Sequence, residues 1–491
     1  MNSLQCSRYT FTFFILSFTF FIFSCSVQKQ IARSAKKNVL GSPVLQNAHI
    51  GISIYEPGTN KYWFNYQGDK YFVPASNTKI PTCYAAMKYL GDSLVGLKYG
   101  IPEELGFKEN VIVIQPTGDP TFLHTDYHKQ PVYEFLEKKF KNTKIEMGYM
   151  DTAWKDERWG SGWSWNDYLE PYMAERNSFP IYGNTISISL NDVKDRNANA
   201  NYYTQKVRLF KTGIDYFDSL VNKTRIQSYS REQFKNPVQY WNISRSFENN
   251  WFDVEKADKP FSNVTVSFAT HGPNTTLEIL EMSFNKQFSF AHRSGYNNSY
   301  SYESYNSDIS TITINQWNTI KSQPTDSLLK PMMHRSDNFF AEQSLLMVSN
   351  EKLGVMSDEK IIDTLLKTDF KDLPQKPRWV DGSGLSRYNL FTPQDFVAIL
   401  NKMKNEFGIE RIKVILPTGG EGTISSYYKS DSGYIYAKTG TLSGVVSLSG
   451  FLYTKKNKLL VFSILVNNHR SSATDVRRAV EKFVQEIRNK Y

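Results

Sequence analysis

Three short strings, widely separated in a chain of 491 residues, place the strongest constraint on its fold. They are Ser76-Asn77-Thr78-Lys79, Ser336-Asp337-Asn338 and Lys438-Thr439-Gly440. If they form one site, the fold must bring the start, the middle and the end of the chain together. Ser76 and Ser336 are 260 positions apart, which is too far for a connection inside one compact core, so this interval must contain inserted structure.

The first string places a nucleophile beside a base. Residues three apart on a helix share one face, so Ser76 and Lys79 can meet. A serine hydroxyl needs such a base at neutral pH, and a lysine serves as one when burial or a nearby cation lowers its pKa. Lys438 could supply that cation. In the second string, we expect Ser336 to relay a proton to the leaving amine and Asn338 to hold an amide of the substrate.

The third string lies in a β-branched and aromatic stretch that begins at Tyr434 and predicts a strand leading into a hairpin. Gly440 would let an extended substrate approach the strand closely, and Lys438 with Thr439 would bind a substrate carboxylate. The backbone N–H groups of Ser76 and Thr441 are the expected oxyanion hole.

Together the strings are the S-x-x-K, S-D-N and K-T-G set, and longer strings around them extend the similarity. The chain resembles the class C low-molecular-mass penicillin-binding proteins, the D-alanyl-D-alanine carboxypeptidase/endopeptidase family of the penicillin-binding protein 4 type, serine peptidase family S13. The resemblance runs from about residue 45 to the C-terminus. The further strings that carry it are residues 334–342, 381–386, 118–120, 162–167 and 416–423.

The resemblance implies an α/β fold: a serine β-lactamase/DD-peptidase-like core, with an antiparallel sheet flanked by helices, and large β-rich insert domains. It also implies a serine DD-peptidase that hydrolyses D-alanyl-D-alanine ends, D-Ala cross-links, or both, through an acyl-serine. The expected partners are peptidoglycan stem peptides, with β-lactams as inhibitors. Two alternatives stay open, a serine β-lactamase and a catalytically silent envelope scaffold.

The N-terminus indicates export. Arg8 precedes an apolar stretch from Phe11 to Phe23, which is shorter than the roughly 20 residues of a membrane span. The stretch ends at Ser24-Cys25, which resembles a bacterial lipoprotein signal with Cys25 as the lipidated residue. We therefore expect a periplasmic or cell-envelope protein, with a lipid anchor favoured over simple secretion or an uncleaved anchor.

The composition argues against disulfide bonds, a metal or cofactor site, and nucleic-acid binding. Only Cys83 lies in the body of the chain, so no intramolecular disulfide is expected, and the scattered histidines suggest neither a metal site nor a cofactor. The formal net charge of +10 is spread along the sequence without a basic run, which argues against nucleic-acid binding.

The predicted organisation is a signal peptide (1–25), a tether (26–44), an N-terminal core segment (45–98), inserted β-rich domains (99–325) and a C-terminal core segment (326–491).

Overall fold

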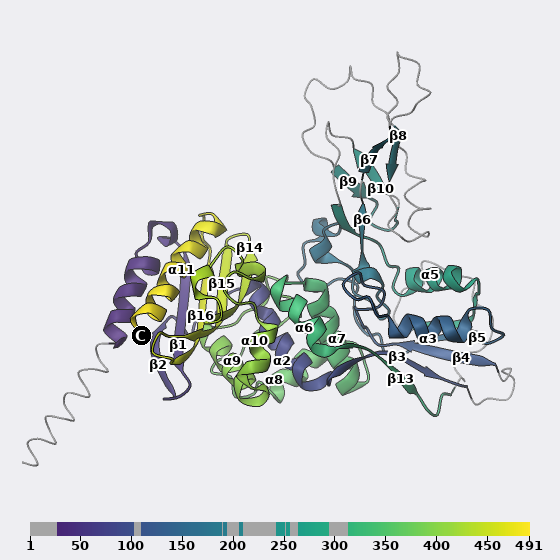
Figure 1. Cartoon of the computed structure of the whole chain (residues 1–491), viewed down its shortest axis with the longest axis horizontal. Coiled ribbons are helices and arrows are strands. Elements are labelled where there is room, and N and C mark those ends of the chain that lie inside the picture. Colours follow the sequence, from purple (N-terminus) through teal and green to yellow (C-terminus); the bar gives the residue numbers. More distant parts are fainter. Residues whose placement is uncertain are drawn as a thin grey trace, which may run out of the picture. The chain divides into compact units, whose positions relative to one another are not determined.

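The computed structural model describes residues 27–102, 110–188, 190–193, 206–209, 242–250, 252–255, 264–293 and 313–491. These residues form two compact units (Figure 1). Within the described residues, the first unit contains 27–84, 329–337 and 362–491, and the second contains the remainder up to residue 328 together with 338–361. The predicted signal peptide and Cys25 lie outside the described residues.

The first unit is built on a five-stranded antiparallel sheet in which both ends of the chain take part. Ile52 of the N-terminal segment pairs with Ile464 near the C-terminus. The interior strands are buried along almost their whole length because helices cover both faces of the sheet. The strand order is β14 (Ile435–Leu442), β15 (Val445–Tyr453), β16 (Leu459–Asn467), β1 (His49–Glu56), β2 (Lys61–Tyr66).

Helix α11 (Ala473–Lys490) covers one face of this sheet (Figure 1). The Oγ atom of Ser472 caps the helix by accepting a hydrogen bond from Asp475 N at 3.1 Å. The buried apolar residues of α11 recur at helical spacing and contribute to the main core of the unit: Val476, Ala479, Val480, Phe483, Val484 and Ile487.

The predicted tether is wrong for most of its length. Residues 27–35 are helical and continue into a π-helical segment, Lys36–Leu40. Ile31, Ala35 and Val39 are buried in the same core as α11, and Ser34 Oγ donates to Glu486 Oε2 at 2.6 Å. These three apolar residues are spaced four apart, so they form one stripe of a helix, whereas the basic residues between them, Arg33, Lys36 and Lys37, are exposed.

Helix α9 (Pro393–Phe407) packs on the sheet strands β1 and β16. A reciprocal capping box starts it: Asp395 N donates to Thr392 Oγ1 at 3.1 Å, and Thr392 N donates to Asp395 Oδ2 at 2.9 Å. Helix α10 (Ile409–Ile415) also lies in the first unit, whereas three helices have residues in both units: α2 (Lys79–Tyr89), α6 (Thr325–His334) and α8 (Asp358–Lys367).

The second unit has a mixed five-stranded sheet of its own. Its order is β12 (Phe288–Arg293), β5 (Glu146–Asp151), β4 (Val111–Pro116), β3 (Ser93–Gly100), β13 (Asn318–Pro324). Helices α3 (Pro131–Phe140) and α5 (Asn274–Phe284) share an apolar, aromatic-rich core with it. The short antiparallel pairs are β6 (Thr185–Ile188) with β11 (Val264–Ser267), β7 (Leu190–Val193) with β8 (Lys206–Leu209), and β9 (Asn242–Arg245) with β10 (Phe252–Glu255).

The unit boundaries differ from the predicted ones. The N-terminal segment of the first unit ends after Tyr84 rather than at residue 98, because β3 pairs with β4 and β13 in the second sheet. Helix α7 (Asn338–Leu353) also belongs to the second unit. Its Gln343 donates through Nε2 to Gly118 O at 2.8 Å and to Asn177 O at 2.9 Å, which ties the helix to the inserted region.

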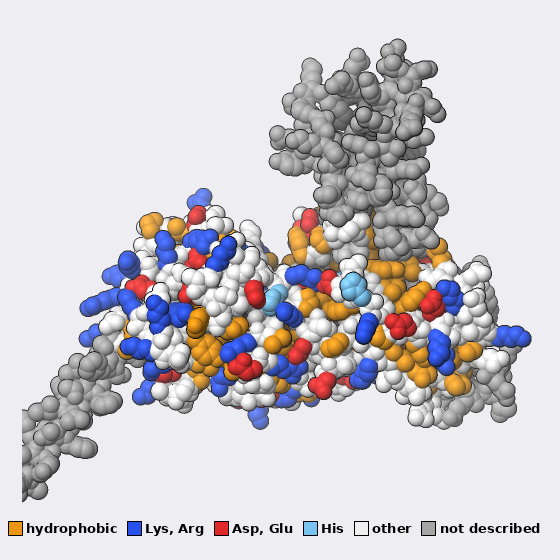
Figure 2. Space-filling view, in the orientation of Figure 1, with side chains coloured by type: hydrophobic (Ala, Val, Ile, Leu, Met, Phe, Trp, Pro, Cys, Tyr) orange, Lys and Arg blue, Asp and Glu red, His pale blue; other side chains and the backbone are white. Residues whose placement is uncertain are grey.

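Basic side chains form no single patch on the face shown in Figure 2. Lys and Arg are interspersed there with Asp, Glu and neutral polar groups.

Over the described ranges, no helix combines the length and the apolar character that a bilayer span requires. The same ranges hold no cluster of three or more His, Cys, Asp or Glu residues suited to a metal ion.

Candidate active site

Ser76 lies in a tight turn at the start of a buried helix. A 3₁₀ turn, Ala75–Thr78, leads directly into α2, and Ala75 has a left-handed φ of 48°. Side chains of β15 hold this turn: Ser447 Oγ donates to Pro74 O at 2.7 Å, and Asn77 Nδ2 donates to Ser449 Oγ at 2.6 Å. A strained, non-glycine conformation persists here because the surrounding bonds fix it.

Lys79 meets Ser76 within one turn of helix. The Nζ atom of Lys79 donates to Ser76 Oγ at 3.1 Å and to the carbonyl oxygen of Ser383 at 2.8 Å. The side chain of Lys79 has no exposed surface. A serine hydroxyl and a buried amine at hydrogen-bond distance are the components of a nucleophile and its base.

A second serine and lysine meet in the same unit. Lys438 Nζ donates to Ser336 Oγ at 2.7 Å and to Thr439 O at 2.7 Å. Burial holds the pKa of Lys438 well below its ordinary value, and the charge of Lys79 lowers this pKa further. The sequence predicts Lys438 as a cation near Lys79, and the structure adds that the pKa of Lys438 is itself lowered by burial and by Lys79. Lys438 is therefore held toward its neutral amine.

Strand β14 lies at the edge of the sheet and against the turn that carries Ser76. A Cβ atom at Gly440 would lie 2.9 Å from Ser76 N and 2.7 Å from Pro74 O, so only glycine permits this approach. Ala437 N donates to Pro417 O at 3.1 Å, away from β15. Because N–H groups alternate along a strand, those of Thr439 and Thr441 point away from β15 as well.

The glycine-rich turn at residues 381–386 positions the partner of Lys79. The buried carboxylate of Asp381 accepts from Gly384 N at 2.8 Å, Ser386 N at 2.7 Å and Asn389 Nδ2 at 2.7 Å. Gly384 has a φ of 82°, and a Cβ there would lie 1.9 Å from Ala75 O. The turn therefore packs directly on the Ser76 turn and presents Ser383 O to Lys79. Asp381 belongs to a string that the sequence comparison singled out, and the structure shows its positioning role; Asn389 is a positioning residue that no sequence motif indicates.

Two further predicted site residues, Thr439 and Asn338, form hydrogen bonds outside the two serine–lysine pairs. Thr439 Oγ1 donates to Thr423 Oγ1 at 2.7 Å, which brings the 416–423 string beside β14. Asn338 is the first residue of α7 and belongs to the second unit, where its Nδ2 donates to Tyr172 O at 2.9 Å. In the first unit the structure thus brings together Ser76, Lys79, Ser336 and Lys438.

Comparison with known proteins gives one consistent result. The sequence profile of the D-Ala-D-Ala carboxypeptidase 3 (S13) family matches residues 32–487. The D-alanyl-D-alanine carboxypeptidase DacB of Haemophilus influenzae is 24% identical over 505 residues, with 96% of each chain covered. A D-alanyl-D-alanine carboxypeptidase from an Actinomadura species is 24% identical over 467 residues, covering 89% of this chain and 80% of that protein.

Among solved structures, penicillin binding protein 4 from Haemophilus influenzae matches with a TM-score of 0.64 at 18% identity, covering 94% of this chain and 98% of that chain. The predicted fold class is therefore confirmed. The protein is a serine-type DD-peptidase, a hydrolase of cell-wall peptidoglycan. More specifically, the chain belongs to the D-Ala-D-Ala carboxypeptidase 3 (S13) family. Neither the β-lactamase nor the scaffold alternative is favoured by these matches.

Proposed function

We propose that Ser76 is the nucleophile that carries the acyl group during hydrolysis of D-alanyl peptides. The observation that carries the proposal is the 3.1 Å hydrogen bond between Lys79 Nζ and Ser76 Oγ at a fully buried lysine. Ser76 Oγ attacks the carbonyl carbon of the penultimate D-alanine while Lys79 takes the hydroxyl proton. The negative charge that develops on the carbonyl oxygen is bound by the N–H groups of Ser76 and Thr441.

The proton that Lys79 took then passes to the departing amine, either directly from Lys79 or through the hydroxyl of Ser336, which gives up one proton as it receives another. Water then releases the acyl group from Ser76. Thr439, with Lys438, binds the terminal carboxylate, and Gly440 allows the substrate backbone to lie along β14. A bound carboxylate would favour the charged form of Lys438, so substrate binding and protonation of this lysine are coupled.

Labelling with a fluorescent penicillin tests the nucleophile. The wild-type protein is expected to give a stable band on a denaturing gel, and Ser76→Ala is expected to give none while remaining folded. An equally strong band in Ser76→Ala would contradict the proposal. Rapid, catalytic turnover of nitrocefin by the wild type would instead indicate a β-lactamase.

The leaving group distinguishes two activities of the same site. Free D-alanine released from a soluble pentapeptide shows carboxypeptidase action, and monomers released from a cross-linked dimer show endopeptidase action. Chromatography of both digests gives their ratio, and Ser76→Ala should abolish both.

Residues 1–25 act, in this proposal, as a lipoprotein signal, and Cys25 carries the lipid that holds the enzyme at an envelope membrane. The supporting observation is the apolar stretch that ends at Ser24-Cys25. Detergent phase partition compares the wild type with Cys25→Ala. The wild type is expected in the detergent phase and the variant in the aqueous phase. Aqueous partition of both proteins would overturn the anchor.

A further inference from the structure

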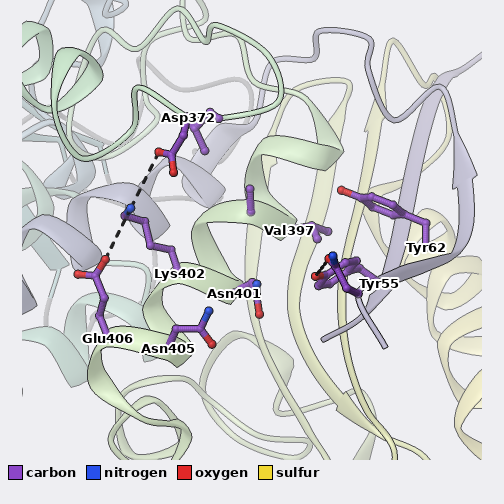
Figure 3. Close-up of a pocket in the computed structure, with 11 residues that line it drawn as sticks. Tyr55, Tyr62, Asp372, Val397, Asn401, Lys402, Asn405 and Glu406 are labelled. Carbon is purple, nitrogen blue, oxygen red and sulfur yellow. Dashed lines mark hydrogen bonds and ion pairs between the residues drawn. The ribbon is translucent and has the colours of Figure 1, made fainter. Parts of the chain in front are cut away.

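A groove lies on the first unit between the β1–β2 hairpin and helix α9 (Figure 3). Its volume is about 470 Å³. Two tyrosines line one side, and asparagines with a charged cluster line the helix side. The lining residues are Tyr55, Asn60, Tyr62, Asp372, Leu373, Val397, Ala398, Asn401, Lys402, Asn405 and Glu406.

The groove lies far from the strand that carries Lys438. Strand β2 forms one edge of the core sheet and β14 forms the other, with β15, β16 and β1 between them. Neighbouring strands are about 4.8 Å apart, so the two edges are roughly 19 Å apart. A ligand in this groove would leave the Ser76 turn and β14 accessible.

The charged groups of the groove compensate one another. Lys402 Nζ lies 3.6 Å from Glu406 Oε1 and 4.0 Å from Asp372 Oδ1, as the dashed lines in Figure 3 show. The carboxylate of Glu406 also accepts hydrogen bonds from Tyr84 Oη at 2.9 and 3.0 Å. Two carboxylates and one ammonium group leave a net charge of minus one, which disfavours an anionic peptide.

The rest of the groove offers neutral hydrogen-bonding groups and aromatic surface. Tyr55 Oη donates to Asn60 Oδ1 at 2.6 Å and so fixes the orientation of that amide. Burial, with smaller contributions from Tyr55 and Asp395, raises the pKa of Tyr62 to about 12, so its hydroxyl stays protonated at neutral pH. The side chains of Asn401 and Asn405 line the helix side of the groove (Figure 3). Their amides are hydrogen-bonding groups of the kind that a neutral polar ligand requires.

We propose that this groove binds the N-acetylated amino-sugar strand of peptidoglycan. Asparagine amides match the hydroxyl and acetamido groups of such a sugar, and tyrosine rings match its apolar ring face. The inference rests on the assigned substrate polymer but not on the role of Ser76. The groove holds the glycan strand, and the distant edge of the sheet acts on the peptide that the strand carries.

The test uses the purified protein and soluble oligomers of N-acetylglucosamine, with binding followed by calorimetry. Asn405→Ala is the first variant, because Asn405 is exposed and its replacement leaves the core intact. Asn401→Ala is the second. Asn489→Ala, an exposed asparagine on α11 outside the groove, is the matched control. Each groove variant should weaken binding about tenfold, the effect of one lost hydrogen bond, and the control should bind as the wild type does.

Two further readouts separate this inference from the assignment of the nucleophile. Fluorescent-penicillin labelling should be unchanged in all three variants, and hydrolysis of intact peptidoglycan should show a raised KM in the groove variants with kcat preserved. Wild-type protein that does not bind the oligomers would overturn the proposal. Unchanged binding of the oligomers in both groove variants would overturn it as well. Loss of penicillin labelling in Ser76→Ala bears only on the nucleophile.

Discussion

The two buried lysines of the first unit each donate to a serine, but the two pairs form by different routes. Ser76 and Lys79 are three residues apart on one turn, at 3.1 Å. Ser336 and Lys438 are 102 residues apart and meet at 2.7 Å through the packing of a loop on an edge strand. The first pair is fixed by helical geometry, and the second depends on tertiary structure. Chemical identity alone therefore does not say which serine is the nucleophile.

Removing the base of the local pair should have the largest effect. Lys79→Met is expected to lower the rate of acylation by about 10²–10⁴-fold, because Ser76 loses its proton acceptor. The rate is measured with fluorescent penicillin in stopped time courses. Lys88→Met, an exposed lysine on the same helix, is the control and should acylate at the wild-type rate. If Lys79→Met were acylated at the wild-type rate, Lys79 would not be the base of Ser76, and this would contradict the account.

In the long-range pair, loss of the Ser336 hydroxyl should reduce peptide turnover by about 10²-fold while Ser76 remains acylatable. Ser336 has a φ of 62°, which alanine adopts with strain and glycine without it. Ser336→Gly and Ser336→Ala are therefore measured together on a soluble pentapeptide. Equal losses in both variants identify the hydroxyl as the cause. Recovery of activity in Ser336→Gly would show that backbone strain, and not proton transfer, is responsible.

The close packing of the 381–386 turn on the Ser76 turn can be tested by measuring the stability of glycine variants. Gly384→Ala adds a Cβ that would lie 1.9 Å from Ala75 O at a φ of 82°. We expect it to lower the free energy of unfolding by about 3 kcal/mol or more. Gly433→Ala has a similar φ of 79° with open space around the added atom, so it should cost only about 1 kcal/mol. Denaturant unfolding compares them, and equal losses would mean that the contact with Ala75 is unimportant.

A smaller effect should appear in the pH dependence of stability. The pKa of Lys438 is lowered in the folded state, so between that lowered value and the ordinary 10.5 the unfolded chain binds more protons than the folded one. The contribution of Lys438 to stability therefore rises with pH through this window. Unfolding of the wild type, followed upward from neutral pH, should show this rise, and Lys438→Met should lack it. Identical pH profiles would contradict the burial of an uncharged amine.

Local patterns in the sequence were sufficient where short-range geometry decides the structure. The S-x-x-K spacing placed two side chains on one face of a turn, and the strand near Tyr434 follows from its β-branched residues. Contacts between residues far apart in the chain cannot be predicted from such local patterns. No local pattern indicates that Asp381 orders the turn that presents Ser383 O, or that Gln343 ties α7 to the inserted region.

Two helical patterns were present in the sequence but were missed. Ile31, Ala35 and Val39 repeat every four residues, and basic neighbours obscured this stripe. Val132, Leu136 and Phe140 show the same spacing in α3, within an insertion expected to be mainly β-structure. In both segments the overall composition does not indicate a helix, and the periodicity carries the structural information.

The most direct measurement is peptide mapping by mass spectrometry after the wild-type protein has reacted with penicillin. Both serines hydrogen-bond to a buried lysine, so the position of the acyl group distinguishes the two pairs. We expect the added mass on the peptide that contains Ser76 and none on the peptide that contains Ser336. An acyl group on Ser336, or a wild-type protein that carries no acyl group under conditions of slow deacylation, would contradict the account.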